Sequence, residues 1–222
     1  VRALQYQAFN LARMVLDQKL PEAMKRPRKP ALVVDIDETV LDNSPYQSLL
    51  ILENTMYPDG WKDWTADASA RALPGAIDFL KYAVSRGVDV YYISNRKVAE
   101  TKGTLKNLQA LGFPQAVHDH LLLRDKESSK KSRRETVLRD HEIILLMGDN
   151  LNDFTTIFEK KSLTERAASV DELKAEWGQR FIVLPNPMYG DWEGAVYEYN
   201  WGANPAEKST MRREALNKFS RE

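Results

Sequence analysis

Short apolar runs alternate along this chain with amphipathic stretches of helix length. Apolar residues recur every three to four positions between Leu4 and Leu20, which predicts an amphipathic helix that Pro21 ends. The same spacing predicts helices after Pro74-Gly75, before Gly112 and over residues 128–139. Uninterrupted apolar runs predict five strands, over residues 31–34, 88–93, 120–123, 142–147 and 181–184.

Strands that alternate with helices predict an α/β fold, a Rossmann-like, doubly wound and mostly parallel sheet with helices on both faces. Residues 44–72 show no clean period and are rich in aromatic residues, so we expect an inserted lid or cap subdomain there. The chain has 222 residues, enough for one domain with a lid. We therefore expect a single domain over residues 1–222, with an N-terminal helix over 1–20 and a C-terminal segment over 186–222.

Composition excludes several classes of protein. The chain has 32 basic and 32 acidic residues, so its charge gives no reason to expect a nucleic-acid polymer as a partner. It has no cysteine, which excludes disulfides, thiolate metal sites and cysteine nucleophiles. No apolar run approaches the roughly 20 residues of a membrane-spanning helix.

Two carboxylates, Asp35 and Asp37, follow the first predicted strand directly. An ionised aspartate is rarely buried without a partner, so two of them at the end of a core strand require a cation, a proton or a reaction. Ligands of open α/β sheets bind at the carboxyl ends of the strands. We therefore expect an active site at Asp35 and Asp37.

Other polar residues follow two further predicted strands and the basic stretch between them. The carboxyl ends of parallel strands meet at one edge of a sheet, so these side chains are expected to converge with the first two carboxylates. They are Ser94, Asn95, Lys130, Asp149 and Asp153.

The chemistry of such a cluster follows from its charge. Clustered carboxylates suit a hard cation, and Mg²⁺ prefers a few carboxylates together with water and phosphate oxygens. A bound Mg²⁺ would offset the repulsion between a carboxylate nucleophile and a phosphate. The Lys130 ammonium, the Ser94 hydroxyl and nearby backbone N–H groups would hold the remaining phosphate oxygens, and Asn95 is a further candidate for this role. One aspartate would attack phosphorus and the other would act as acid and base.

Four segments, in this order, resemble motifs of the haloacid dehalogenase superfamily, and within it the class C (DDDD-type) bacterial acid phosphatases. They are D-I-D-E-T-V-L-D-N-S-P-Y, I-S-N-R, S-S-K-K-S-R-R and G-D-N-L-N-D-F. The likeness extends to L-P-N-P-M-Y-G-D-W-E-G near residue 194. One departure is Asn152, where the family often has Asp, and we expect little effect from it. The four aspartates of the class name correspond to Asp35, Asp37, Asp149 and Asp153.

The resemblance implies a Mg²⁺-dependent phosphomonoesterase, an acid phosphatase or nucleotidase that hydrolyses nucleoside monophosphates and other phosphate monoesters through an aspartyl-phosphate. It implies that Asp35 is the nucleophile and Asp37 the acid and base. Mg²⁺ would bind the Asp35 carboxylate, the Asp37 main-chain carbonyl and the Asp149 carboxylate. Asp153 would support the metal's waters or orient Lys130.

The resemblance also implies an extracytoplasmic location, in the periplasm or at the bacterial outer surface. A lipid anchor in a segment ahead of Val1 would then tether the protein to a membrane. Aromatic residues near the C-terminus favour a homodimer.

Several assignments leave alternatives open. Lys130 has basic neighbours, and a basic run is usually a solvated helix face, but the motif selects Lys130. Trp64 and Tyr189 either stack on a nucleobase or pack within the lid or at a subunit interface. Arg96 either pairs with a carboxylate of the cluster or is solvated.

Two other functions fit the same motifs. A phosphotransferase would use the same residues, and the choice depends on how well the lid excludes water. A non-catalytic surface lipoprotein that binds a ligand would keep the fold, although the presence of both Asp35 and Asp37 argues against it.

Overall fold

A central sheet of five parallel strands organises the protein, which a computed structural model describes over residues 1–217. The strand order is β5-β4-β1-β6-β7, and each strand lies where an apolar run predicted one, so the predicted α/β class is confirmed. The strands are β1 (Lys29–Val34), β4 (Asp89–Lys97), β5 (Leu121–Arg124), β6 (His141–Gly148) and β7 (Phe181–Val183).

Helices cover both faces of this sheet. Side chains of a strand point alternately to the two faces, and in β1 Leu32 and Val34 join one core while Ala31 and Val33 join another. The first core is completed by α1 (Arg2–Ala23), α4 (Ala76–Ser85) and α5 (Thr101–Ala110), and the second by α6 (Lys131–Asp140). Burial on both faces explains why the strands read as uninterrupted apolar runs.

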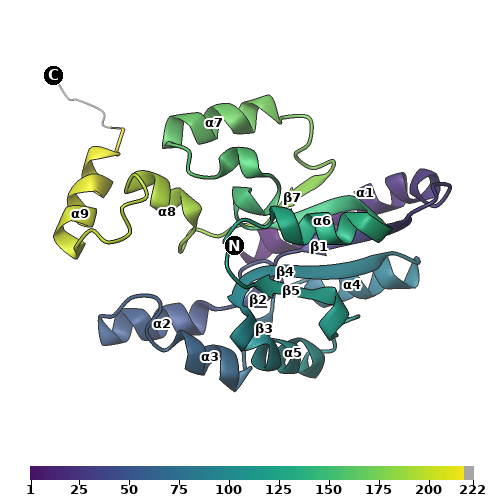
Figure 1. The fold of residues 1–222 in the computed structure, drawn as a ribbon, viewed down its shortest axis with the longest axis horizontal. Coiled ribbons are helices and arrows are strands. Elements are labelled where there is room, and N and C mark those ends of the chain that lie inside the picture. The colour runs from purple at the N-terminus through teal and green to yellow at the C-terminus, as the bar shows by residue number, and fades with distance from the viewer. Residues whose placement is uncertain (218–222) are drawn as a thin grey trace.

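Two groups of elements extend beyond the sheet at one end. Residues 44–72 form α2 (Ser44–Glu53), α3 (Trp61–Asp67) and β3 (Arg71–Ala72), and β3 pairs antiparallel with β2 (Leu41–Asp42). Figure 1 shows α2 and α3 at the lower left, whereas α8 and α9 lie at the upper left. The helices that follow β6 are α7 (Leu163–Glu172), α8 (Asp191–Val196) and α9 (Pro205–Glu214). Of the C-terminal segment predicted over 186–222, residues 218–222 lie outside the described residues.

In the described part of the chain, four short 3₁₀ helices lie among the loops: η1 (Val98–Glu100), η2 (His118–His120), η3 (Leu151–Asp153) and η4 (Thr156–Phe158). No helix within residues 1–217 is long and apolar enough to cross a membrane.

The N-terminal helix is longer than the sequence predicted. We expected Pro21 to end it after residue 20, but α1 continues to Ala23, so this boundary was wrong. Proline removes one backbone donor from the last turn. Leu20 and Ala23 are nevertheless buried in the core, and the N–H of Met24 donates to the carbonyl oxygen of Leu20 at 2.9 Å. Tertiary packing thus holds a turn that local propensity disfavours.

Strand β4 also runs further than predicted. Ser94, Asn95 and Arg96 were expected after the strand, but they belong to it, and the pairing with β5 shifts between Ser94 and Lys97. Strand alternation buries Ser94 and Arg96 and leaves Asn95 exposed. The extension therefore decides which of the three polar side chains point into the protein.

A polar cluster holds together the amino ends of three strands. Asp89 at the start of β4 accepts hydrogen bonds from Lys29 Nζ at 2.7 Å and from Gln115 Nε2 at 2.8 Å. Its other oxygen lies 2.9 Å from Nε2 of His141 at the start of β6. Burial opposes ionisation of Asp89, but the hydrogen bonds from Lys29, Gln115 and His141 prevail and lower its pKa to about 2.

We predict that Asp89→Asn lowers the free energy of unfolding by about 1–2 kcal/mol at neutral pH, because the amide leaves the Lys29 ammonium without its counter-ion. The folded-state pKa of Asp89 lies below its unfolded value of 3.8, so its stabilisation is present above that value and is lost as the pH falls toward about 2. Urea unfolding of both proteins across this range measures the effect. A difference between them that does not narrow in acid would contradict the prediction.

Candidate active site

The carboxyl ends of β1, β4 and β6 lie side by side, because β1 pairs with both neighbours. The backbone N–H of Asp35 donates to the carbonyl oxygen of Met147 at 2.9 Å, which places Asp35 beside the end of β6. The edge that the sequence predicted as a site therefore brings the first carboxylate next to Asp149.

Lys130 lies between two carboxylates. Its Nζ is 2.7 Å from Oδ1 of Asp153 and also pairs with Oδ1 of Asp35, and only 6% of its side chain is exposed. Burial disfavours the ammonium, but Asp153 and Asp35 prevail and raise the pKa of Lys130. By contrast, the neighbours Lys126 and Lys131 are exposed. Of these three lysines, the structure thus brings Lys130 to the cluster.

Asp35, Asp149 and Asp153 form a group that can hold a metal ion, with one oxygen from each lying within 4.8 Å of the others. Thr39 Oγ1 lies 3.4 Å from Oδ2 of Asp35 and 3.3 Å from Oδ1 of Asp149. The other oxygen of Asp149 accepts a hydrogen bond from Nδ2 of Asn186 at 2.7 Å. A donor set made only of oxygens fits a hard divalent cation such as Mg²⁺.

These carboxylates crowd negative charge into a buried space. Burial raises the pKa of Asp35 to about 7 against the attraction of the Lys130 ammonium. Burial, followed by repulsion from Asp153 and Asp35, raises the pKa of Asp149 well above its usual value. A divalent cation bound here would relieve this repulsion and return the carboxylates to their ionised form.

The turn after β6 depends on Gly148. A Cβ at this position would lie 2.2 Å from Oδ2 of Asp153, so a side chain would displace that carboxylate. The same oxygen accepts a hydrogen bond from the backbone N–H of Asn150 at 2.9 Å, and this bond closes the η3 turn. The spacing G-D-N-x-x-D therefore combines a glycine that leaves room for the Asp153 carboxylate with a turn that brings Asp153 and Asp149 into the same group of carboxylates.

Asp37 is held apart from this group by a separate set of donors. Arg96 donates to Oδ1 of Asp37 from Nε at 3.0 Å and from Nη2 at 2.8 Å. Asn43 Nδ2 donates to Asp37 at 2.8 Å and the Ser94 hydroxyl at 3.2 Å. Burial alone would raise the pKa of Asp37, but the Arg96 guanidinium and these hydrogen bonds lower it. Of the two alternatives for Arg96, the structure shows the ion pair.

Asn95 is exposed at the same edge, and its Oδ1 accepts a hydrogen bond from Nη2 of Arg133 at 2.7 Å. The side chain of Asp37 is outside the group of carboxylates that can hold a metal ion, and the expected contribution of its main-chain carbonyl to a metal site stays a prediction.

Glu38 is a residue whose part in the site sequence reasoning missed. It has a left-handed backbone (φ 55°), which turns its buried carboxyl toward Asn43. The carboxyl accepts hydrogen bonds from the backbone N–H of Asn43 at 2.9 Å and from Nδ2 of Asn43 at 3.1 Å. Burial, and next the nearby Asp37, raise the pKa of Glu38 to about 8.

The two candidate stacking residues are both anchored to this Glu38–Asn43 pair. Trp64 Nε1 donates to Oδ1 of Asn43 at 2.8 Å, and the Tyr189 hydroxyl donates to Oε2 of Glu38. Trp64 also packs against the core of α2 and α3. The structure therefore places both rings at the Glu38–Asn43 pair, one from residues 44–72 and one from the C-terminal segment.

The other missed residues lay within motifs that were already recognisable. Thr39 belongs to the D-E-T segment, Arg133 to S-S-K-K-S-R-R, and Asn186 to L-P-N-P-M-Y. Their position in these motifs was the available signal, but which polar atom each one contacts depends on the fold.

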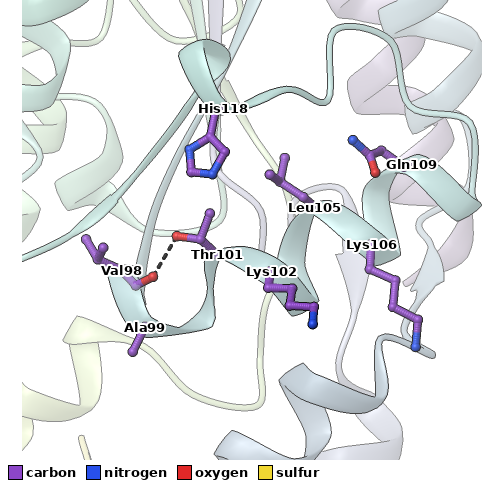
Figure 2. Close-up of a pocket in the computed structure, with 8 residues that line it drawn as sticks. All are labelled: Val98, Ala99, Thr101, Lys102, Leu105, Lys106, Gln109 and His118. Carbon is purple, nitrogen blue, oxygen red and sulfur yellow. Dashed lines mark hydrogen bonds between the residues drawn. The ribbon is translucent and has the colours of Figure 1, made fainter.

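A surface groove of about 630 Å³ lies elsewhere, on the outer side of α5. Figure 2 shows Val98, Leu105 and His118 around it, with the ammonium ends of Lys102 and Lys106 pointing away from His118. None of the predicted site residues lines this groove, so it is separate from the carboxylate cluster.

The chain is similar to known acid phosphatases. The model of the haloacid dehalogenase superfamily, subfamily IIIB (acid phosphatase), matches residues 1–192, which include all four aspartates. The structure of the class C acid phosphatase from Bacillus anthracis is 49% identical, with a TM-score of 0.95 over 99% of this chain and 92% of that one. A crystal structure of the class C enzyme from the same organism with tungstate bound is 50% identical, with the same TM-score and coverage.

A more distant relative is acid phosphatase 1 of Solanum lycopersicum, 26% identical over 168 residues. The alignment covers 71% of this chain and 57% of the tomato protein, so the chain spans little more than half of that relative. The family match and the B. anthracis structures confirm the resemblance seen in the motifs, and the chain belongs to the acid phosphatases of subfamily IIIB in the haloacid dehalogenase superfamily.

Proposed function

We propose that the protein is a Mg²⁺-dependent phosphomonoesterase that hydrolyses nucleoside monophosphates and other phosphate monoesters. The observation that carries this proposal is the convergence of Asp35, the Lys130 ammonium and the oxygens of Asp149 and Asp153. Family membership supports the reaction class. The tungstate bound to the B. anthracis relative supports a site for a tetrahedral oxyanion, which has the shape of phosphate.

The proposed reaction has two steps, both centred on Asp35. A carboxylate oxygen of Asp35 attacks phosphorus, the bond to the ester oxygen breaks, and Asp37 gives a proton to the departing alcohol. Water then attacks the aspartyl-phosphate and gives its proton to Asp37. Inorganic phosphate leaves, and both carboxyl groups return to their first state.

Other residues of the chain bind and orient the reacting groups. Lys130 contacts Asp35, so its ammonium is placed to hold a phosphoryl oxygen beside the nucleophile, with Ser94 and Asn95 nearby on β4. Arg96 and Asn43 keep the Asp37 carboxylate in one orientation. Mg²⁺, held by Asp35, Asp149 and the Asp37 carbonyl with Asp153 in support, would reduce the repulsion between carboxylate and phosphate.

The proposal extends to assembly and location. The large side chains Trp192 and Trp201 are 41% and 52% exposed in and after α8, and they support a homodimer. An extracytoplasmic location with a lipid tether stays a prediction of the family resemblance. Measuring the mass of the protein in solution tests the dimer.

We predict that Asp35→Asn lowers phosphate release by about a thousandfold or more, because an amide cannot form the aspartyl-phosphate. Phosphate release from a panel of monoesters measures this loss. The control is Asp119→Asn, which changes an exposed carboxylate. Activity near the wild-type level in Asp35→Asn would contradict the proposed nucleophile, and an alcohol phosphate formed in place of inorganic phosphate would indicate a phosphotransferase.

We predict that EDTA abolishes activity and that added Mg²⁺ restores it, since repulsion within the carboxylate group then has no counter-charge. Asp149→Asn is expected to raise the Mg²⁺ concentration for half-maximal activity by about tenfold or more. Titration calorimetry of Mg²⁺ measures the same loss without turnover. Full activity in EDTA would contradict a metal-dependent mechanism.

We predict that Trp64→Leu and Tyr189→Leu lower kcat/KM for nucleoside monophosphates by about tenfold or more, since stacking on a base contributes about 1–3 kcal/mol. Glycerol phosphate, which has no base, should lose much less, and Trp64→Phe and Tyr189→Phe should retain most of the preference. Equal losses on both substrates would show that the rings pack rather than bind the base.

A further inference from the structure

Two consecutive arginines, Arg133 and Arg134, are buried beside the proposed site, and the reaction described above uses neither. They are 9% and 8% exposed in the first turns of α6, directly after Lys130. Within residues 1–217, no carboxylate lies within ion-pair distance of either guanidinium. A buried cation without a carboxylate partner destabilises a fold unless hydrogen bonds compensate for its lost hydration. The hydrogen-bond partners of Arg133 and Arg134 therefore indicate which parts of the site each side chain holds in place.

Arg133 links the end of β4 to the loop that leads into Lys130. Its Nη1 donates to the carbonyl oxygen of Ser94 at 2.5 Å, and its Nη2 donates to Oδ1 of Asn95 at 2.7 Å. Nη2 also lies 2.9 Å from the carbonyl oxygen of Ser129 and 3.2 Å from that of Ser128. One guanidinium therefore sets the position of Ser94 relative to Lys130, the two groups proposed to hold the phosphoryl oxygens.

Arg134 links α6 to the turn that carries Asp153. Successive helix residues point about 100° apart, so its side chain leaves α6 in another direction from that of Arg133. Its Nη1 donates to the carbonyl oxygen of Asp153 at 2.9 Å and contacts that of Asn152 at 3.4 Å. This contact sets the position of the Asp153 carboxylate, which pairs with Lys130 and belongs to the group that can hold a metal.

We infer that Arg133 and Arg134 are positioning residues with separate tasks: Arg133 holds the phosphoryl-binding groups in place and Arg134 holds the metal-binding turn in place. The inference rests on the proposed function, because it assigns each arginine to one half of that site. Neither arginine touches the reacting atoms in this assignment, and each acts through the loop that it holds.

The tasks require arginine rather than a positive charge alone. A guanidinium presents five N–H donors in a rigid planar fork, so Arg133 reaches the end of β4 and the loop before α6 at once. A lysine at the same position keeps the charge, but its single ammonium on a flexible chain cannot reproduce the fork. Arg→Lys variants therefore separate positioning from electrostatic attraction.

The experiment measures binding of two probes by titration calorimetry, Mg²⁺ alone and tungstate at saturating Mg²⁺. Arg133→Lys is expected to weaken tungstate binding by about tenfold or more and to change Mg²⁺ binding by less than about threefold. Arg134→Lys is expected to weaken Mg²⁺ binding by about tenfold or more, with a smaller effect on tungstate once Mg²⁺ is saturating. The matched control is Arg139→Lys in the exposed last turn of α6, which should leave both constants unchanged.

The pattern of the two constants distinguishes positioning from general stability. The titration stoichiometry gives the folded fraction of each variant, so a partly unfolded variant still yields the affinity of its folded molecules. If both variants bind Mg²⁺ and tungstate with equally weakened affinity, or if neither variant loses affinity for either probe, the inference is overturned. The proposed function still stands in that case, provided that the wild-type protein binds both probes. A wild-type protein that binds neither probe would overturn the proposed function and the inference together.

Discussion

The ammonium of Lys130, buried between Asp35 and Asp153, is the interaction on which the candidate site depends. Several carboxyl groups meet where three parallel strands end, and burial with mutual repulsion opposes their ionisation. One buried cation offsets part of this charge and still leaves oxygens of Asp35 and Asp149 for a metal. The loop before α6 and the turn after β6 must therefore keep fixed positions relative to β1. The buried side chains of Arg133 and Arg134 donate hydrogen bonds to this loop and to this turn, respectively.

A second polar network, centred on Asn43, surrounds Asp37 and is separate from the cluster around Lys130. Asn43 binds Asp37 and Glu38 through its amide nitrogen and accepts a hydrogen bond from Trp64 through its amide oxygen. Tyr189 reaches the same Glu38 from the C-terminal segment. Residues 44–72 and the C-terminal segment, which lie at opposite sides of the sheet end in Figure 1, are thus both hydrogen-bonded to the Glu38–Asn43 pair.

The separation of the two networks explains how neighbouring aspartates acquire opposite properties. Asp35 and Asp37 are two residues apart, yet the pKa of Asp35 is raised to about 7 and that of Asp37 is lowered. Burial raises the pKa of both. For Asp37 the Arg96 ion pair and the hydrogen bonds from Arg96, Asn43 and Ser94 together outweigh burial, whereas for Asp35 burial outweighs the attraction of the Lys130 ammonium. A cation bound beside Asp35 would lower its pKa and favour the ionised nucleophile, whereas Asp37 must take up a proton before it can act as an acid.

The sequence by itself determined the α/β fold, the five strands and the convergence of the motif residues at one edge, because apolar periodicity and the rule that parallel strands end together are local or topological facts. Local signals gave the wrong boundary at two places where contacts distant in the sequence decide the structure. Helix α1 continues past Pro21 because Leu20 and Ala23 are buried in the core, and Ser94 and Arg96 belong to β4, whose pairing with β5 shifts between Ser94 and Lys97. Only the tertiary structure decided that Arg96 pairs with Asp37, that Arg133 donates to the end of β4 and that Arg134 donates to the turn after β6. Such contacts join residues far apart in the chain, and a hydrogen bond depends on distances and angles that sequence spacing does not specify.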